Sequence, residues 1–502
     1  MFKFQWNKQY TDAIIVALLI ALPVILAGEP FGDDFYRLRD GETYQFDKGI
    51  VTSWRYCGRP LVVWLFQLLS GNEFVFNLYP LPQILGIVLY AVSLSWIVQR
   101  FDVKDRLVSV LIILSALTVP FMYQNYMYQY DALTMCISIA ILSITPLILN
   151  PKNKQQWIKY SIIKVLLIMS ALLFYSTPIP SYFILSLFLY LQSHQNNKSK
   201  ILFWNTGLLI TAYILSTVFL NIFFDTHYIQ NNSKVSWDLL PYKIFTKPFE
   251  LFEEMLLPYY GVSFNWLAPL LLLLSAFAIM FNRLKKESRL ERIGGLEKMI
   301  LFFSISLMAF VTIIFVSLPD ITIFKHRMYF SLSSAYFCIV FIVLQYAKSK
   351  TELLKKIAMS VVVIMLIPAI TSLYIAMKAY SMQQDYERML ITSIYKGLGD
   401  IGLSKDDNQK ITFMCNRTWY APYTKKLLER KPYMADWVYA ASNHTPAHIG
   451  NYLNLYQINA EVDMVLSKKF VYNKTEQIYS HYLYSIHRGK IDGKEKLIIC
   501  VK

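Results

Sequence analysis

Long apolar runs alternate with short polar segments over residues 1–378 of the chain. The hydrocarbon core of a bilayer is about 30 Å thick, so a helix needs about 20 apolar residues to cross it. By that measure the pattern predicts about eleven transmembrane helices. They cover residues 12–28, 79–98, 106–121, 132–149, 160–176, 180–193, 202–223, 264–281, 299–318, 328–347 and 357–378. A further apolar run at 61–70 is too short to span, which favours a helix lying at the membrane interface.

The basic residues between these runs predict the orientation of the chain. Lys and Arg are concentrated in five connecting segments: 100–106, 152–159, 198–200, 283–298 and 348–356. All five fall on one side of the membrane if the amino terminus lies on that side too. Because retained cytoplasmic loops carry excess positive charge, that side is the cytoplasm. We therefore expect a multi-pass protein of the bacterial inner membrane with a cytoplasmic amino terminus, whose first apolar run is an uncleaved span.

The segment after the last apolar run differs in composition. It is charged, lacks a long apolar stretch and is long enough for a small domain. Local patterns predict a small α/β or α+β domain there, with strands at 410–415 and 496–502, a hairpin at 491–493 and helices at 424–429 and 448–455. The expected organisation is a transmembrane domain, 1–378, with a first outer loop at 29–78, and a periplasmic C-terminal domain, 379–502.

Composition agrees with a chain surrounded largely by membrane lipid. Hydrophobic residues make up 55% of the sequence and charged residues only 16%, against about 25% charged in soluble domains. The net charge of +16 is carried mostly by the short loops, and no groove-reading motif accompanies it, so nucleic acid is not an expected partner. The sequence also lacks a Walker A loop, a dinucleotide fingerprint, HExxH and GxSxG, so nothing indicates nucleotide chemistry.

The cysteines give little guidance, because none of the five forms a CxxC pair. Cys415 and Cys500 fall in the exported tail, where oxidation is permitted. They could form a disulfide, although spacing alone does not fix the pairing.

Two adjacent carboxylates, Asp33 and Asp34, follow the first predicted span directly. At a membrane edge they lose hydration and repel each other, so one of them would hold its proton more tightly. Such a pair can act as a general base, or can bind a divalent cation such as Mg or Mn through hard oxygen ligands. The structural alternative is a helix cap. The site is favoured by polar and aromatic company in the same loop, namely Arg37, Asp40, Trp54 and Arg59.

Arg59 and Asp131 are further candidates for substrate contacts. Arg59 precedes the short apolar run, where a guanidinium group could bind a lipid phosphate through two donors, or could simply extend to the interface. Asp131 is the only acid of a short outer loop, and it could contact a sugar or a metal, or cap a helix.

A basic cluster, Lys325-His326-Arg327, stands at the outer end of a later span. Positive charge is not expected on that side, so His326 and Arg327 are candidates for binding an anionic lipid phosphate. The alternative is ion pairing with Asp320.

The first outer loop carries a likeness to a known family. The residues that carry it are Asp33-Asp34-Phe35-Tyr36-Arg37, Gly41, Trp54 and Gly58-Arg59-Pro60-Leu61. This pattern, and the layout of spans and tail, resembles the serotype-converting (Gtr type) O-antigen glucosyltransferases of enteric bacteria and their phages.

The resemblance implies a polytopic α-helical enzyme of the GT-C type. Its donor would be undecaprenyl-phosphate glucose, made by a donor synthase and delivered to the periplasmic face by a flippase, and its acceptor would be O-antigen polysaccharide. Asp33 and Asp34 match the acidic residues of that family's first loop. A carboxylate there would accept the proton of the attacking hydroxyl, and the attack would invert the anomeric centre.

Two other classes stay open. A flippase for a lipid-linked sugar would carry charges inside the spans, whereas the charges here cluster at span ends. An O-antigen polymerase or a membrane acyltransferase would use a mid-chain outer loop. The loop at 225–262 qualifies, because its acids include Asp238, Glu250, Glu253 and Glu254.

Overall fold

A computed structural model represents the 502-residue chain. It describes residues 7–34, 37, 54, 57–71, 76–148, 154–192, 198–224, 234–251, 253, 267–289, 295–319, 326–402, 411–414, 420–438, 440, 453, 458, 471, 475–491 and 493–501. The chain divides into two compact units. The first contains Met1–Leu26, Val51–Gly71 and Leu78–Tyr374, and the second contains Ala27–Ile50, Asn72–Asn77 and Ile375–Lys502.

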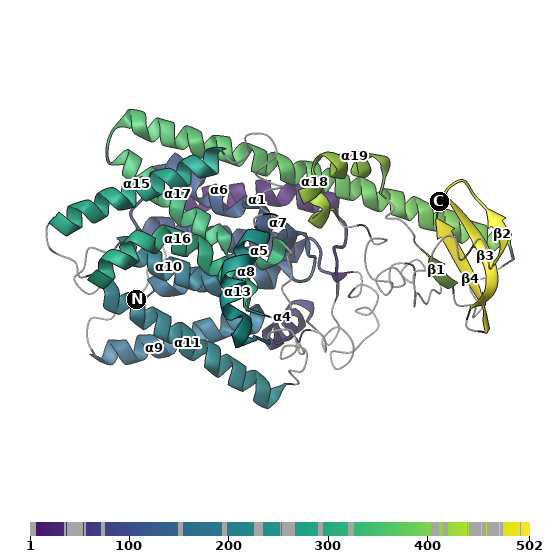
Figure 1. The fold of residues 1–502 in the computed structure, drawn as a ribbon, viewed down its shortest axis with the longest axis horizontal. Helices are drawn as coiled ribbons and strands as arrows, with labels where there is room; N and C mark the ends of the chain where they lie inside the picture. The colour runs from purple at the N-terminus through teal and green to yellow at the C-terminus, as the bar shows by residue number, and fades with distance from the viewer. Residues whose placement is uncertain are drawn as a thin grey trace. The chain divides into compact units, whose positions relative to one another are not determined.

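The first unit is a bundle of helices (Figure 1). Its α-helices are α1 (Lys8–Ala27), α4 (Pro60–Ser70), α5 (Leu81–Arg100), α6 (Arg106–Leu117), α7 (Pro120–Met127), α8 (Ala132–Ile144), α9 (Lys154–Phe174), α10 (Ile179–Gln192), α11 (Lys198–Phe223), α13 (Leu240–Leu251), α15 (Leu267–Arg289), α16 (Gly295–Ser317), α17 (Leu332–Lys348) and the first part of α18 (Glu352–Asp400). Short 3-10 turns are η1 (Thr145–Leu147), η2 (Trp237–Leu239) and η4 (His326–Met328).

A helix occupies each of the eleven apolar ranges predicted to span. Among the described residues, five helices are long and apolar enough to cross a membrane: α1, α5, α9, α11 and α18. Helices α6 and α7 together qualify as a sixth, bent by 69°. The others, α8, α10, α15, α16 and α17, contain shorter apolar stretches. The protein therefore has several membrane-type helices, while a total of eleven spans stays a prediction. Helix α4, with 11 residues, is as short as expected.

Helix α1 has one buried face and one exposed apolar face. Its buried apolar residues recur at helical spacing: Ala13, Val16, Ala17, Ile20, Ala21 and Val24. The opposite face exposes large apolar side chains: Ile15, Leu18, Leu19, Leu22 and Leu26. An exposed apolar face is costly in water and favourable in lipid, so α1 presents one face to protein and the other to the bilayer.

Close helix contacts and bends shape the bundle core. Gly86 lets α5 approach α8, because an added Cβ would lie 3.0 Å from the Ala132 carbonyl oxygen. Pro120 starts α7, and Val119 before it is extended (φ −63°, ψ 129°), as a residue preceding proline prefers. That break turns α7 away from α6 and buries its whole length, so its polar residues face the protein interior.

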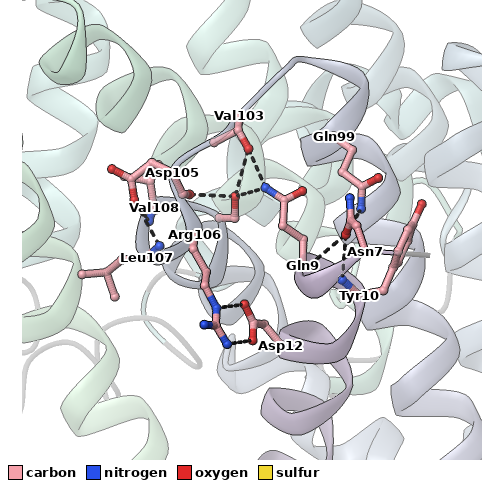
Figure 2. Close-up of polar contacts among 11 residues, drawn as sticks. Asn7, Gln9, Tyr10, Asp12, Gln99, Val103, Asp105, Arg106, Leu107 and Val108 are labelled. Carbon is pink, nitrogen blue, oxygen red and sulfur yellow. Dashed lines mark hydrogen bonds and ion pairs between the residues drawn. The ribbon is translucent and has the colours of Figure 1, made fainter. Parts of the chain in front are cut away.

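A polar network fixes α1 to the connection between α5 and α6 (Figure 2). Gln9 Nε2 donates to the Val103 carbonyl oxygen at 2.6 Å, and Arg106 forms a two-point ion pair with the buried Asp12. Asp105 caps α6 by accepting from the backbone N–H groups of Leu107 (3.1 Å) and Val108 (3.2 Å). Burial raises the pKa of Asp105, but hydrogen bonds from Lys355 and the Val108 N–H outweigh it and lower the pKa overall.

The second unit combines the C-terminal part of α18, from residue 375, with a small sheet (Figure 1). Its other elements are β1 (Ile411–Met414), α19 (Pro422–Arg430), the turn η5 (Pro432–Asp436), β2 (Glu476–Ser480), β3 (Tyr484–Ile491) and β4 (Lys494–Val501). The strand order is β1-β4-β3-β2, with β1 parallel to β4 and the other pairs antiparallel. The predicted strands, the hairpin (Gly493 has φ +76°) and the helix near 424–429 are confirmed. The helix predicted at 448–455 lies outside the described residues, apart from residue 453.

The part of helix α18 from residue 375 onward supports the other elements of the second unit. The whole helix has 49 residues, and a helix of that length measures about 74 Å, more than twice the hydrocarbon thickness. Beyond residue 375 its buried positions repeat every three and four residues: Ala376, Tyr380, Gln383, Glu387, Leu390, Ile394 and Gly397. The sheet packs at its end, where the Tyr484 hydroxyl donates to the Ser393 carbonyl oxygen at 2.6 Å. Cys500 is buried in β4, and Cys415 lies outside the described residues, so their pairing stays a prediction.

Candidate active site

The acidic segment after α1 belongs to the second unit and forms a tight turn. Asp34 is fully buried, and its Oδ2 accepts a hydrogen bond from the Phe31 N–H at 3.0 Å. The Asp34 N–H in turn donates to the Phe31 carbonyl oxygen at 3.1 Å. Gly32 sits between them at φ +57°, a conformation that glycine adopts without strain. The Asp34 side chain therefore holds its own backbone turn.

The two aspartates differ in environment. Arg37 Nη1 lies 3.6 Å from Asp34 Oδ1, and both side chains are buried. Removing one partner of a buried ion pair leaves the other charge uncompensated, which costs about 3–5 kcal/mol. Asp33 is partly exposed. Asp34 is thus tied into the protein, whereas Asp33 can reach solvent or a substrate.

In the first unit, Trp54 and Asp131 meet in the interior. The indole N–H of Trp54 donates to Asp131 Oδ1 at 3.0 Å, and the two residues are only 1% and 2% exposed. Asp131 stands at the start of α8, yet its carboxylate makes no capping bond to that helix. The Trp54 ring stacks on Phe66 of α4, with ring centroids 5.2 Å apart. The carboxylate is therefore oriented by a residue of the first outer loop.

Arg59 extends this cluster toward α9. Its backbone N–H donates to the Trp54 carbonyl oxygen at 2.8 Å, and Pro60 begins α4 directly after it. The guanidinium carbon lies 4.3 Å from the ring centroid of Tyr175, a favourable cation–π distance. Tyr175 is itself fixed, because its carbonyl oxygen accepts from Ser138 Oγ at 2.6 Å.

Arg327 is held in a similar way by α7 and the residue after it. Its backbone N–H donates to Gln124 Oε1 at 2.8 Å, its guanidinium group donates to the Tyr128 hydroxyl, and its Cζ lies 5.2 Å from the Tyr128 ring centroid. The ring centroids of Phe330, just beyond η4, and Tyr175 are 5.8 Å apart. Tyr175 is the ring against which the Arg59 guanidinium group lies. A ring contact therefore joins the residue that holds Arg59 to the segment just after Arg327.

The structure brings Trp54, Arg59 and Asp131 into one cluster and places Arg327 on adjoining elements. Asp40 and the side chain of His326 lie outside the described residues, as do Asp320 and Lys325. Sequence reasoning missed Phe66, Tyr175, Gln124 and Tyr128 as partners. The polar and aromatic run that precedes Asp131 was the available signal for the last two.

The described residues contain no cluster of side chains typical of a metal site. Over the described ranges, no group of three or more His, Cys, Asp or Glu side chains is placed to hold an ion. Binding of a divalent cation by Asp33 and Asp34 stays a prediction.

Comparison with known proteins gives one family and one relative. Residues 40–336, more than half of the chain, match the family described as Glucosyl transferase GtrII. That range contains Trp54, Arg59, Asp131 and Arg327. A protein of Salmonella phage P22, described as an uncharacterized 55.3 kDa protein in the gtrB 5' region, is 32% identical over 145 residues. The alignment spans only 28% of this chain and 28% of that relative. No solved structure matches the chain.

The family match begins after Asp33 and Asp34 and covers residues 40–78 of the first outer loop, the buried tryptophan–aspartate pair and both arginine sites, in a chain that contains several apolar helices. This protein is accordingly a member of the GtrII glucosyl transferase family.

Proposed function

We propose that the protein transfers a glucosyl residue from a polyprenyl-phosphate sugar to O-antigen polysaccharide at the periplasmic face of the inner membrane. The observation that carries the proposal is the family match over residues 40–336. The apolar helices support it, because a lipid-linked donor needs an enzyme that it can reach from the bilayer. A synthase would make the donor, undecaprenyl-phosphate glucose, and a flippase would deliver it.

The donor phosphate is assigned to the arginine sites. As the bond between the anomeric carbon and the phosphate oxygen breaks, negative charge grows on the polyprenyl phosphate. Arg59 and Arg327 each present a guanidinium group held against a tyrosine ring, which limits the entropy lost when phosphate binds. His326, the residue before Arg327, is also assigned to the donor phosphate. Asp131, oriented by Trp54, is assigned to the hydroxyl groups of the transferred sugar.

The acceptor hydroxyl is assigned to the acidic segment. Its oxygen attacks the anomeric carbon from the face opposite the phosphate, its proton passes to a carboxylate, and the anomeric centre inverts. Asp33 is the better base, because it is partly exposed, whereas Asp34 is buried against Arg37 and holds the turn. Arg37 serves substrate binding through this support of the turn, and Asp40 is assigned to the acceptor sugar.

The test compares O-polysaccharide from cells that express the wild-type chain, Asp33→Asn, Asp34→Asn or the double variant. Glucosyl content is measured by NMR, and the protein is quantified in the membrane fraction. Wild type should add a glucosyl residue, and Asp33→Asn should abolish the addition at normal protein levels.

The matched control for these variants is Asp102→Asn, an exposed aspartate that pairs with an exposed Lys104 at 3.6 Å. It should keep full activity. Unchanged glucosylation in Asp33→Asn would sink the assignment of Asp33 as the base, and unchanged glucosylation in the double variant would exclude both aspartates. No glucosylation by wild type would sink the proposed function.

A further inference from the structure

Two turns of α18 hold the segment that carries the aspartate pair. The Tyr380 hydroxyl donates to the Pro30 carbonyl oxygen, and the Tyr380 ring meets the Phe31 ring edge to face, with centroids 5.7 Å apart. Two turns further on, Arg388 forms an ion pair with Glu29, whose side chain is only 11% exposed. Residues 29–31 are therefore held from one helix by a hydrogen bond, a ring contact and a charge pair.

This part of α18 also forms hydrogen bonds with the C-terminal domain. Gln383 Oε1 accepts from the Ala421 N–H at 2.8 Å, and Thr424 Oγ1 donates to the Ala379 carbonyl oxygen at 3.1 Å. Gln383 Nε2 donates to Glu387 Oε1 at 2.9 Å, which fixes the orientation of the amide. These groups are buried, so each bond is worth more than it would be in water.

A continuous path of contacts links this part of α18 to the aspartate pair. Phe31 packs on Tyr380, and Phe31 exchanges two hydrogen bonds with Asp34 through its N–H and its carbonyl group. Pro30, on the other side of Phe31, restricts the backbone where Tyr380 binds it. A shift of α18 or of residues 421–424 would therefore be passed to the turn that contains Asp33 and Asp34.

We propose that residues 379–388 of α18 form a clasp that positions the aspartate pair, with Tyr380 and Arg388 as positioning residues and the C-terminal segment 421–424 locking the clasp. This inference rests on the proposed function, in which Asp33 is the base. It gives the C-terminal domain a role, namely to hold α18 and the acidic segment together in the active arrangement. The domain itself needs no substrate contact for that role.

Displacing the base should lower kcat and leave the KM for the donor unchanged. A misplaced base slows proton transfer in the chemical step and leaves donor binding unchanged, and a displacement of about 1 Å can cost about a hundredfold in rate. Tyr380→Phe removes one hydroxyl group and keeps the ring contact, so we expect kcat to fall about tenfold with an unchanged KM for the donor. Arg388→Gln should act in the same direction.

The experiment uses the full-length chain in membranes, a polyprenyl-phosphate glucose donor and O-polysaccharide acceptor. Tyr395→Phe and Lys396→Gln are matched controls, because both residues lie on the same helix and are exposed. They should keep wild-type kcat and KM. The charge swap, Glu29→Arg with Arg388→Glu, should recover most of the activity that either single substitution loses, which a loss of folding would not produce.

Two activity results would overturn the clasp while leaving the proposed function intact: wild-type kcat in both Tyr380→Phe and Arg388→Gln, or a charge swap that rescues nothing. A readout independent of activity completes the design. Glu29→Cys and Arg388→Cys, introduced together, should be joined by a short bismaleimide, as detected by mass spectrometry. Absence of that cross-link would overturn the clasp, whereas a wild-type chain without glucosyl transfer would overturn the function.

Discussion

The indole N–H of Trp54 donates a hydrogen bond to the carboxylate of Asp131, a residue 77 positions further along the chain. The pair joins the first outer loop to the start of α8, and both side chains are buried. A buried carboxylate must be matched by donors, so this bond fixes where the Asp131 oxygens point.

Replacing Trp54 with Phe should weaken that arrangement. The ring that stacks on Phe66 is largely kept, but one donor to a buried carboxylate is lost, which costs about 1–3 kcal/mol. We expect glucosyl transfer to fall about tenfold or more. The matched control is Trp64→Phe on α4, whose side chain is 55% exposed. Equal transfer rates in the two variants would show that the Trp54 donor has no role in the site.

Replacing Arg59 or Arg327 with Lys keeps the positive charge and removes the planar group that lies on a tyrosine ring. Lysine binds phosphate as a point charge and cannot offer two parallel donors. We expect the KM for the lipid donor to rise about tenfold in each variant, measured with membranes and a graded donor concentration. Arg100→Lys, at the exposed end of α5, is the control. A donor KM equal to that of wild type would place the phosphate elsewhere.

Two glycines of α18 should respond to alanine in opposite directions. A Cβ on Gly397 would overlap the Tyr484 hydroxyl and lie 3.0 Å from Tyr479 Cε1, so Gly397→Ala should destabilise the second unit by about 1–3 kcal/mol. A Cβ on Gly399 meets nothing within 4 Å, so Gly399→Ala should stabilise the helix by up to about 1 kcal/mol. Thermal unfolding of the purified chain measures both. The same sign for both variants would contradict the packing of the sheet on α18.

The C-terminal domain should lose stability in acid through His487. Burial lowers the pKa of His487 below the ordinary value of an exposed histidine, and its ring nitrogens lie 2.9 Å from Ser485 Oγ and 3.3 Å from Thr475 Oγ1. The unfolded chain therefore binds a proton more readily than the folded one, so stability falls as the pH drops below about 6.5. His487→Asn should flatten the fall in melting temperature between neutral and mildly acidic pH. A fall of the same size in His487→Asn as in wild type would show that this side chain does not carry the effect.

Chelation tests whether the aspartate pair needs a divalent cation. The charge of Asp34 is already met by Arg37, and its Oδ2 is engaged by the Phe31 N–H, so a cation would have to compete with both. We expect glucosyl transfer to persist after treatment with EDTA. Loss of transfer with EDTA, and its recovery with Mg or Mn, would instead make Asp33 and Asp34 cation ligands.

Much of the architecture could be predicted from sequence because it depends on local pattern. Apolar runs such as 12–28 and 79–98 predict helices, since length and hydropathy alone decide what a bilayer accepts. The hairpin at Gly493 and the strand at 496–502 also follow from local signals. The number of spans could not be settled in this way, because α8 and α17 are short and α6 bends into α7 at Pro120.

The residues of the site could be named from sequence, but their relationships could not. Adjacent acids after a span single out Asp33 and Asp34, yet only tertiary packing distinguishes the buried, ion-paired Asp34 from the partly exposed Asp33. Likewise, the polarity of a short outer loop singles out Asp131, but whether its carboxylate caps α8 or meets Trp54 depends on contacts between distant segments. The sequence determined which chemical groups the chain carries and which segments suit lipid, because these are properties of single residues and short windows. The tertiary structure decided which groups share an environment, because burial and pairing arise only when distant segments pack together.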